Sequence, residues 1–155
     1  MTKIKYSVLL MLIAANISSA GTGALSIKVT ALDAIVKRGS RIMVRVTTTN
    51  SSDHEITYHD TSRDCDYSVT VLTGAGASAL ETESKRGLVC SSSELRITGK
   101  DIVVTLKPGE SNDERLELTH LYDVSIPGEY TVNVERTFAG IGRLRSNSTK
   151  VKVAE

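Results

Sequence analysis

Apolar and polar residues alternate with a period of two along most of the chain after residue 23, and helical periodicity is nearly absent. Turn-forming residues such as Gly39-Ser40, Asn50 to Asp53 and Pro108-Gly109 separate the alternating runs. The runs cover 26–31, 41–49, 55–59, 65–71, 101–106, 115–119, 130–134 and 149–153. The pattern predicts an all-β domain in which seven to eight short strands form two antiparallel sheets packed face to face.

Four of these runs define the expected core. Their inward-facing positions are Ile42, Val44 and Val46; Cys65, Tyr67, Val69 and Val71; Tyr130, Val132 and Val134; and Thr149, Val151 and Val153. Because side chains on one face of a strand recur at every second residue, each set should point into the same layer. This alternation predicts that Cys65 belongs to the core layer.

The pattern fades between Thr73 and Lys100, where Gly, Ala, Ser and charged residues dilute any period. Ser78-Ala79-Leu80-Glu81 matches a capping box and indicates the start of a short helix, while an irregular meander fits the segment equally well. A long exposed connection of this kind is where a β-sandwich commonly carries a binding surface.

The first twenty residues have the pattern of an export signal. Lys3 and Lys5 precede an apolar run from Val8 to Ala15, and Ser18-Ser19-Ala20 provides small residues for a signal peptidase. The apolar run is about half the length that a membrane span requires. We therefore expect residues 1–20 to be a signal peptide and residues 21–155 to be one domain without a membrane span, located in the periplasm or secreted.

The composition argues against several classes of binding partner. Removing Lys3 and Lys5 from the 19 basic residues leaves 17 against 18 acidic ones, so the formal charge changes from +1 to −1. No long basic run occurs, and the chain has no tryptophan. Neither nucleic acid nor an anionic membrane is expected as a partner, and a stacking platform for sugars or bases is disfavoured.

Cys65 and Cys90 are the two cysteines. In an oxidising compartment an even number of cysteines favours a disulfide, which in the chain-entropy model would stabilise the fold by about 3 kcal/mol. A redox or metal-binding pair is the alternative, although there is no C-x-x-C motif and the spacing fits no zinc pattern.

Two motifs resemble a known group of domains. Leu106-Lys107-Pro108-Gly109-Glu110-Ser111 is followed by Leu121-Tyr122-Asp123-Val124-Ser125-Ile126-Pro127-Gly128-Glu129-Tyr130-Thr131-Val132. Together they resemble bacterial secreted immunoglobulin-like domains, including the domain that precedes the catalytic part of some deuterolysin-type metallopeptidases. They resemble more distantly the Bacillus-type intracellular proteinase inhibitor fold. The resemblance implies an immunoglobulin-like antiparallel β-sandwich and says little about activity. Together with the long connection from Thr73 to Lys100, it motivates the hypothesis of a protein-interaction module that modulates a proteinase.

The motif also suggests a structural corner. Pro127-Gly128 would turn the chain, and Tyr130 would bury its ring while its hydroxyl bonds the backbone just upstream, as in a tyrosine corner. The chain departs from antibody-type domains because it has no core tryptophan and its cysteines do not occupy the inter-sheet positions. No H-E-x-x-H motif occurs, so metallopeptidase chemistry is not implied.

Three other sequence patterns have both a functional and a purely structural interpretation. Residues 74–79 fit G-x-G-x-x-A with Glu94 further on, yet no second βαβ unit follows, which favours a simple turn over a dinucleotide loop. The acidic residues Asp60, Asp64 and Asp66 are interpreted as a solvated acidic turn, because their spacing lacks the D-x-D-x-D-G loop, and a calcium site is the alternative. Two sequons, beginning at Asn50 and Asn147, are interpreted as polar turn and strand residues.

The three histidines are His54, His59 and His120. Asp53-His54 and His59-Asp60 place a carboxylate next to an imidazole, but neighbouring residues on a strand face opposite ways, so no hydrogen-bonded dyad is expected. No G-x-S-x-G motif supplies a nucleophile. We expect no catalytic, cofactor-binding or metal-binding residues.

The sequence thus predicts an exported, non-enzymatic binding module whose partner is another exported or cell-envelope protein. A small hydrolase or metal-dependent enzyme around His59, Asp60 and Asp64 is the first alternative. A structural component of the cell envelope is the second. The oligomeric state is left open.

Overall fold

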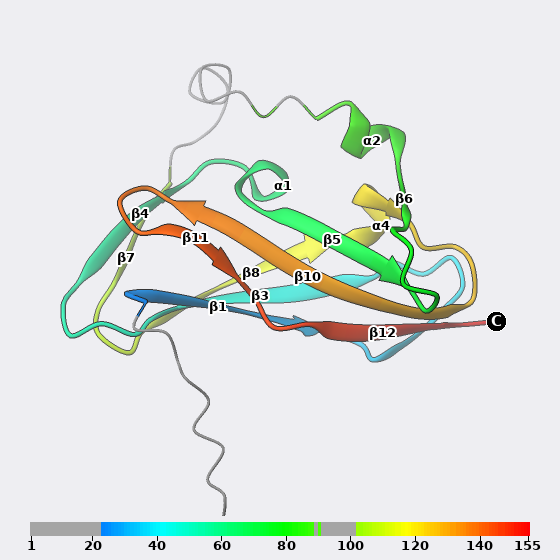
Figure 1. Ribbon diagram of the computed structural model, residues 1–155, viewed down its shortest axis with the longest axis horizontal. Coiled ribbons are helices and arrows are strands. Elements are labelled where there is room, and N and C mark those ends of the chain that lie inside the picture. Colours follow the sequence, from blue (N-terminus) through cyan, green and yellow to red (C-terminus); the bar gives the residue numbers. More distant parts are fainter. Residues whose placement is uncertain (1–22, 89, 91–101) are drawn as a thin grey trace, which may run out of the picture.

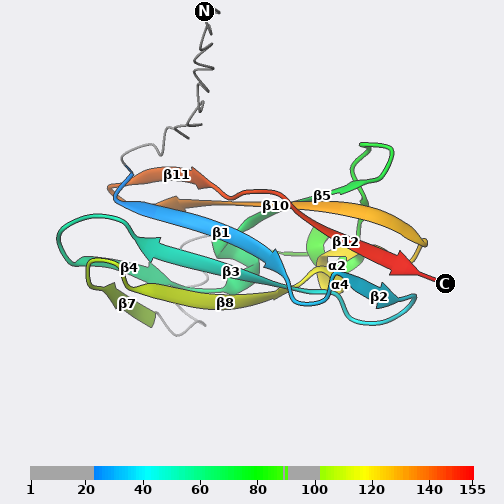
Figure 2. The same cartoon turned by 90° about the horizontal axis from the view of Figure 1, so that it is seen from below.

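Two β-sheets lie face to face in the computed structural model, which describes residues 23–88, 90 and 102–155 (Figures 1 and 2). The first, here the β3 sheet, is antiparallel with the order β1-β3-β8. Its strands are β1 (Leu25–Ala31), β3 (Met43–Asn50) and β8 (Ser111–Glu117). The second, here the β10 sheet, contains β2 (Ile35–Lys37), β5 (Ser68–Thr73), β10 (Gly128–Phe138), β11 (Gly142–Arg145) and β12 (Thr149–Ala154).

Strand β10 is the centre of its sheet. One edge pairs with β5, while β11 and β12 pair with successive parts of the other edge, so they lie end to end (Figure 1). Strand β2 continues the sheet beyond β12 in a parallel pairing. The remaining described pairs are β4 (Ile56–Asp60) with β7 (Ile102–Leu106), and β6 (Leu80–Glu81) with β9 (Tyr122–Asp123). The helices of the described residues are each one turn long and lie in the connections: α1 (Arg63–Asp66), α2 (Glu83–Arg86) and α4 (Leu118–Leu121).

The observed architecture confirms the all-β sandwich. Eight of the described strands are five residues or longer, and each overlaps one of the eight alternating runs. The predicted inner-face valines Val44, Val46, Val132 and Val134 are fully buried in the main core. A smaller cluster around Phe138 fills one end of the sandwich. Period-two burial therefore determines both the strands and their orientation.

Polar side chains close the ends and edges of the strands. Asn50, which is 0% exposed, donates to the carbonyls of His54 (2.7 Å) and Leu106 (2.9 Å). Asn147 exchanges two hydrogen bonds with the backbone of Val29, at 2.9 and 3.0 Å, and so covers the free edge of β1. Both sequon asparagines thus have structural partners, in agreement with their interpretation as turn and strand residues.

The expected position of Cys65 is wrong. Residues 63–66 form helix α1 because the carbonyl of Ser62 accepts hydrogen bonds from the amides of Cys65 (2.9 Å) and Asp66 (2.7 Å), and β5 begins only at Ser68. Cys65 is half-buried and outside both core clusters. Alternation alone did not reveal that the run contains a helical turn followed by a strand.

The expected helix start at Ser78 is also wrong. Ser78 forms a β-bridge with Leu72, and the amide of Ala79 donates to the carbonyl of Val71 at 2.8 Å. The helix begins four residues later, after Thr82, whose Oγ1 accepts from the amide of Lys85 at 3.2 Å. The backbone of this segment pairs with the edge of β5 instead of forming the predicted helix.

At the sequence-predicted corner, the ring of Tyr130 is buried and its hydroxyl donates to the carbonyl of Ile126 at 2.8 Å. This bond ties the start of β10 to the loop that contains Pro127. The predicted signal peptide, residues 1–20, lies outside the described residues. Among the residues that are described, no helix is both long enough and apolar enough to cross a membrane.

Candidate interaction site at the disulfide end of the sandwich

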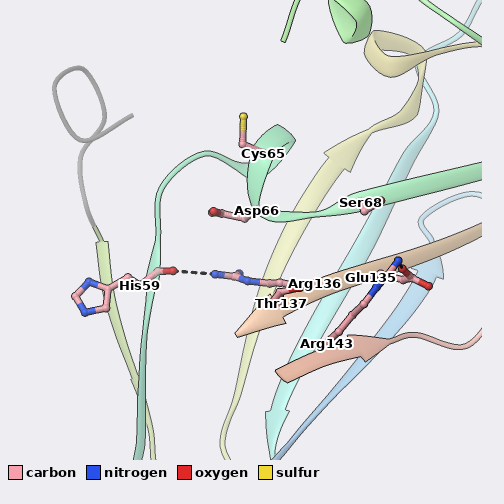
Figure 3. A pocket seen from close by; sticks show the side chains of 8 residues that line it. All are labelled: His59, Cys65, Asp66, Ser68, Glu135, Arg136, Thr137 and Arg143. Carbon is pink, nitrogen blue, oxygen red and sulfur yellow. Dashed lines mark hydrogen bonds and ion pairs between the residues drawn. The ribbon is translucent and has the colours of Figure 1, made fainter. Parts of the chain in front are cut away.

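A polar depression of about 380 Å³ opens at the end of the sandwich where β4, α1 and the β10–β11 hairpin meet (Figure 3). Its lining residues are His59, Cys65, Asp66, Ser68, Glu135, Arg136, Thr137 and Arg143. Most of them are charged or carry a hydroxyl, so the surface suits hydrogen bonding better than the burial of an apolar ligand.

A disulfide lies at the rim of this depression. Cys65 is bonded to Cys90, with 5.4 Å between their Cα atoms, which confirms the predicted bridge. Cys65 is half-buried and Cys90 is exposed. The bridge therefore attaches the chain that follows α2 to the turn that precedes β5.

Beneath the depression, β10 places a buried arginine among three strands. The side chain of Arg136 is only 4% exposed, and its Nη2 lies 2.5 Å from Oδ1 of Asp60 in an ion pair. Nη2 also donates to the carbonyl of His59 at 2.9 Å, and Nη1 donates to the hydroxyl of Tyr67 at 3.2 Å. A second carboxylate, Oε2 of Glu114, lies 3.7 Å from Nη1. This arrangement offsets the cost of burying the guanidinium.

Aromatic rings enclose the same guanidinium. Its central carbon lies 4.6 Å from the ring centre of Phe138, 5.0 Å from that of Tyr58 and 5.1 Å from that of Tyr67. Tyr58 and Phe138 themselves meet edge to face at 5.2 Å. The ring faces attract the cation, so the cluster combines ionic and cation–π contacts at the junction of β4, β8 and β10.

Burial and neighbouring charges shift the pKa values of the ionisable groups in this cluster. Desolvation raises the pKa of Glu114, although the hydroxyl of Tyr67 donates to its carboxylate and works against that rise. Desolvation and the hydrogen bond to Glu114 raise the pKa of Tyr67, so it stays a neutral donor. For Arg136, burial opposes the charge, but Tyr67 and Asp60 outweigh it and the pKa lies above its ordinary value. The charged guanidinium of Arg136 therefore lies next to two carboxyl groups, those of Asp60 and Glu114.

Glu114→Gln is expected to be nearly neutral for stability at pH 7, within about 1 kcal/mol, because glutamine still accepts the Tyr67 hydrogen bond and removes one desolvated charge. A carboxyl whose pKa is raised by folding contributes stability at low pH that is lost as the pH rises through its folded-state value. The stability of the natural chain relative to the variant should therefore decrease from about pH 4 towards neutrality. Urea titrations at several pH values measure this, and a relative stability that rises with pH would contradict it.

The other charges that line the depression are paired as well. Glu135 accepts from Nε of Arg145 at 2.5 Å and from Arg143, and these two arginines lower its pKa. The carboxylate of Asp66 accepts from the amide (2.8 Å) and the hydroxyl (2.7 Å) of Thr61. The lining thus consists of charges fixed by partners within the domain.

No family model and no curated protein matches the chain. Solved structures with a related arrangement include the CARDB domain of a Pyrococcus furiosus protein, at 12% identity and a TM-score of 0.42, which covers 84% of this chain and 93% of that one. They also include the sporulation control protein Spo0M of Bacillus subtilis, at 10% identity and a TM-score of 0.45, covering 86% and 50%. A β-glucosidase of Listeria innocua matches at 18% identity and a TM-score of 0.44, covering 86% and 16%. At these scores no function is transferred to the chain.

The residues of the alternative enzyme hypothesis do not form one site. Asp60 is buried against Arg136, whereas the neighbouring His59 is exposed and its ring points away from the depression (Figure 3). Oδ2 of Asp64 lies 4.0 Å from Nε2 of His120. Among the described residues, no three His, Cys, Asp or Glu side chains are close enough together to hold a metal ion, and this includes the suggested calcium ligands.

The structure also tests the expectations for the Asp53-His54 pair and for residues 74–79. Asp53 and His54 do form a hydrogen-bonded pair, with 3.0 Å between Oδ1 and Nδ1, because they lie in an exposed turn and not on a strand. Residues 74–79 form a tight turn in which the amide of Gly76 donates to the carbonyl of Thr73 at 2.8 Å, as the turn interpretation predicted.

Sequence reasoning missed Arg136 and Glu114, although a signal was present. Arg136 continues the inward-facing series of β10 between Val134 and Phe138. Glu114 occupies the corresponding position two residues before the buried Leu116 of β8. Opposite charges at inward positions of two strands indicate a buried ion pair, and no catalytic motif marks these positions.

Proposed function

We propose that the chain is an exported, non-enzymatic interaction module that binds another exported or cell-envelope protein through the depression at its disulfide end. The observation that carries this proposal is that Asp66, Glu135, Arg136 and Arg143 all have partners inside the domain. Groups fixed in this way offer a preorganised hydrogen-bonding surface and no free acid, base or nucleophile.

The disulfide and the N-terminal pattern support an extracytoplasmic location. A structural disulfide between Cys65 and Cys90 is typical of proteins that fold in an oxidising compartment. Residues 1–20 have the basic start, apolar run and small-residue end of a signal peptide. Cleavage after Ala20 would release a chain beginning at Gly21, which mass measurement of the exported product would detect.

The resemblance of residues 102–134 to secreted immunoglobulin-like domains suggests the partner class. One branch of that resemblance is a domain attached to a metallopeptidase, and the other is a proteinase inhibitor fold, so a proteinase is the first partner to consider. The hydrolase alternative lacks support because Asp60 is already neutralised by Arg136. A structural role in the envelope would use the same surface for a non-proteinase partner.

Site-specific crosslinking in living cells tests the proposed surface. A photoreactive side chain at Thr137, which is exposed and lines the depression, should capture a discrete exported protein that mass spectrometry can identify. The matched control is Thr47, which faces outward on the β3 sheet, away from the depression. We expect a specific product from position 137 and none from position 47.

Two results would overturn this proposal. Equal capture from both positions would indicate random encounters, and absence of any product from position 137 would remove the depression as a binding site. Recovery of a proteinase would support the more specific role, whereas recovery of an envelope component would assign the module to a structural assembly.

A further inference from the structure

Five basic side chains that are scattered along the sequence gather on the outer face of the β10 sheet. In β11 and β12, outward-pointing basic residues alternate with inward-facing ones, of which Val151 and Val153 are buried and Leu144 is partly buried, and β2 adds a fifth basic residue. The five residues, here called the basic stripe, are Lys37, Arg143, Arg145, Lys150 and Lys152. Strands β11 and β12 lie end to end along one edge of β10, with β2 beside β12 (Figures 1 and 2). The two basic residues of β11 and the two of β12 therefore follow this edge of β10, and Lys37 lies one strand further out.

The basic stripe has an excess of positive charge. The acidic residues that face the same side of the sheet are Glu129 and Glu135, both on β10. Glu129 pairs with Lys150 at 2.7 Å, and Glu135 pairs with Arg143 and Arg145. Within the described part of the chain, Lys37 and Lys152 have no acidic partner. Five basic groups against two acidic ones leave a local charge of +3.

The excess arises because basic and acidic side chains lie on different parts of the domain, and not because the protein as a whole is basic. The described residues carry 15 basic and 16 acidic side chains, so their total formal charge is −1. The balancing acidic groups lie elsewhere in the domain, partly in turns and connections such as those with Asp33, Asp53 and Glu110. A basic face on a slightly acidic domain attracts anionic partners to that face, and the rest of the surface does not attract them.

We propose that the basic stripe binds a linear anionic polysaccharide. Side chains on one face of a strand recur about every 7 Å, so the four basic residues of β11 and β12 form a row along the edge of β10 that suits an extended polymer, and Lys37 lies beside the end of this row. The side chains of Arg143, Arg145 and Lys150 are 69%, 76% and 66% exposed, which leaves their charges accessible. Long-range charge complementarity, and not a closed pocket, provides the attraction.

Other anionic partners fit this surface less well. No aromatic ring of the described β10 sheet faces outward, because Tyr130 and Phe138 are buried, so bases of a single-stranded nucleic acid would find no stacking surface. Ile35 is the large apolar side chain exposed beside Lys152, which gives little area for insertion into a membrane. The preference for a polysaccharide over a nucleic acid also rests on the proposed export of the domain.

Direct binding of the purified protein to defined polymers tests the inference. The probes are polygalacturonate, uncharged dextran, single-stranded DNA, and vesicles of phosphatidylcholine with phosphatidylglycerol. The stripe variant is Lys37→Ser with Lys152→Ser, because these two residues can be changed without breaking an ion pair of the described chain. Its matched control is Lys28→Ser with Arg115→Ser, which removes the same charge from the outer face of the β3 sheet.

The natural chain should bind polygalacturonate in preference to the other three probes, and binding should weaken steeply as salt is raised. The stripe variant should bind about tenfold more weakly. The control variant should bind as the natural chain does, and Lys37→Arg with Lys152→Arg should retain binding. Undetectable binding to polygalacturonate, equal losses in both serine variants, or tighter binding to DNA or vesicles would overturn the inference. None of these outcomes bears on the crosslinking result at Thr137, so the two proposals fail separately.

Discussion

Arg136→Met should lower the free energy of unfolding by about 3–5 kcal/mol, the largest effect of any single substitution considered for this domain. Methionine fills much of the space within the aromatic rings but leaves the carboxylates of Asp60 and Glu114 buried without their cation. It also removes the donors to the Tyr67 hydroxyl and the His59 carbonyl. Urea or thermal denaturation followed by circular dichroism measures the change.

Matched variants separate charge from packing in this prediction. Arg143→Met removes an arginine that is 69% exposed, and should change stability by less than about 1 kcal/mol. Combining Arg136→Met with Asp60→Asn and Glu114→Gln should recover part of the loss, because the remaining groups are then neutral. If Arg136→Met alone costs no more than the Arg143 control, the cluster does not stabilise the fold as described.

Alternation predicted the sheets because the sheets are amphipathic. The series Tyr130, Val132, Val134 is buried as expected, and the same holds for Val151 and Val153, since one face of each strand must leave water. The short strands β2, β6, β9 and β11 could not be predicted in this way. With two to four residues, they contain too few alternations to form a pattern, and β2, β6 and β9 also pair with strands distant in sequence.

The candidate site was harder to predict because it depends on tertiary position. Cys65 was assigned to a strand by its spacing from Tyr67, but hydrogen bonds to the Ser62 carbonyl favour a helical turn there. Arg136 and Asp60 are 76 positions apart in the chain and meet only because β4 and β10 converge at one end of the sandwich. The basic stripe likewise combines R-x-R at residues 143–145 with K-x-K at residues 150–152. Each pair is visible in the sequence, but their common line appears only once both strands are placed beside β10.

Replacing both Cys65 and Cys90 with serine is expected to destabilise the domain by about 3 kcal/mol. The bridge joins residues 25 positions apart, and in the chain-entropy model its loss gives the unfolded chain the freedom that the closed loop had removed. Neither cysteine belongs to a core cluster, so little packing should be lost. The melting temperature should decrease by roughly 10 °C while the β-sheet circular dichroism signal of the folded state is kept.

Reductant provides the control for this experiment. Dithiothreitol should lower the melting temperature of the natural chain to that of the double serine variant and leave the variant unchanged. Helix α1 should persist in both, because Asp66 still holds the amide and hydroxyl of Thr61 and Tyr67 remains in the core. Crosslinking from Thr137 should weaken in the variant, since the rim of the depression is then anchored only at α1. Loss of all β structure on reduction would instead show that the bridge holds the sandwich together, and would contradict the view that a hydrophobic core formed by alternating strands is sufficient for the fold.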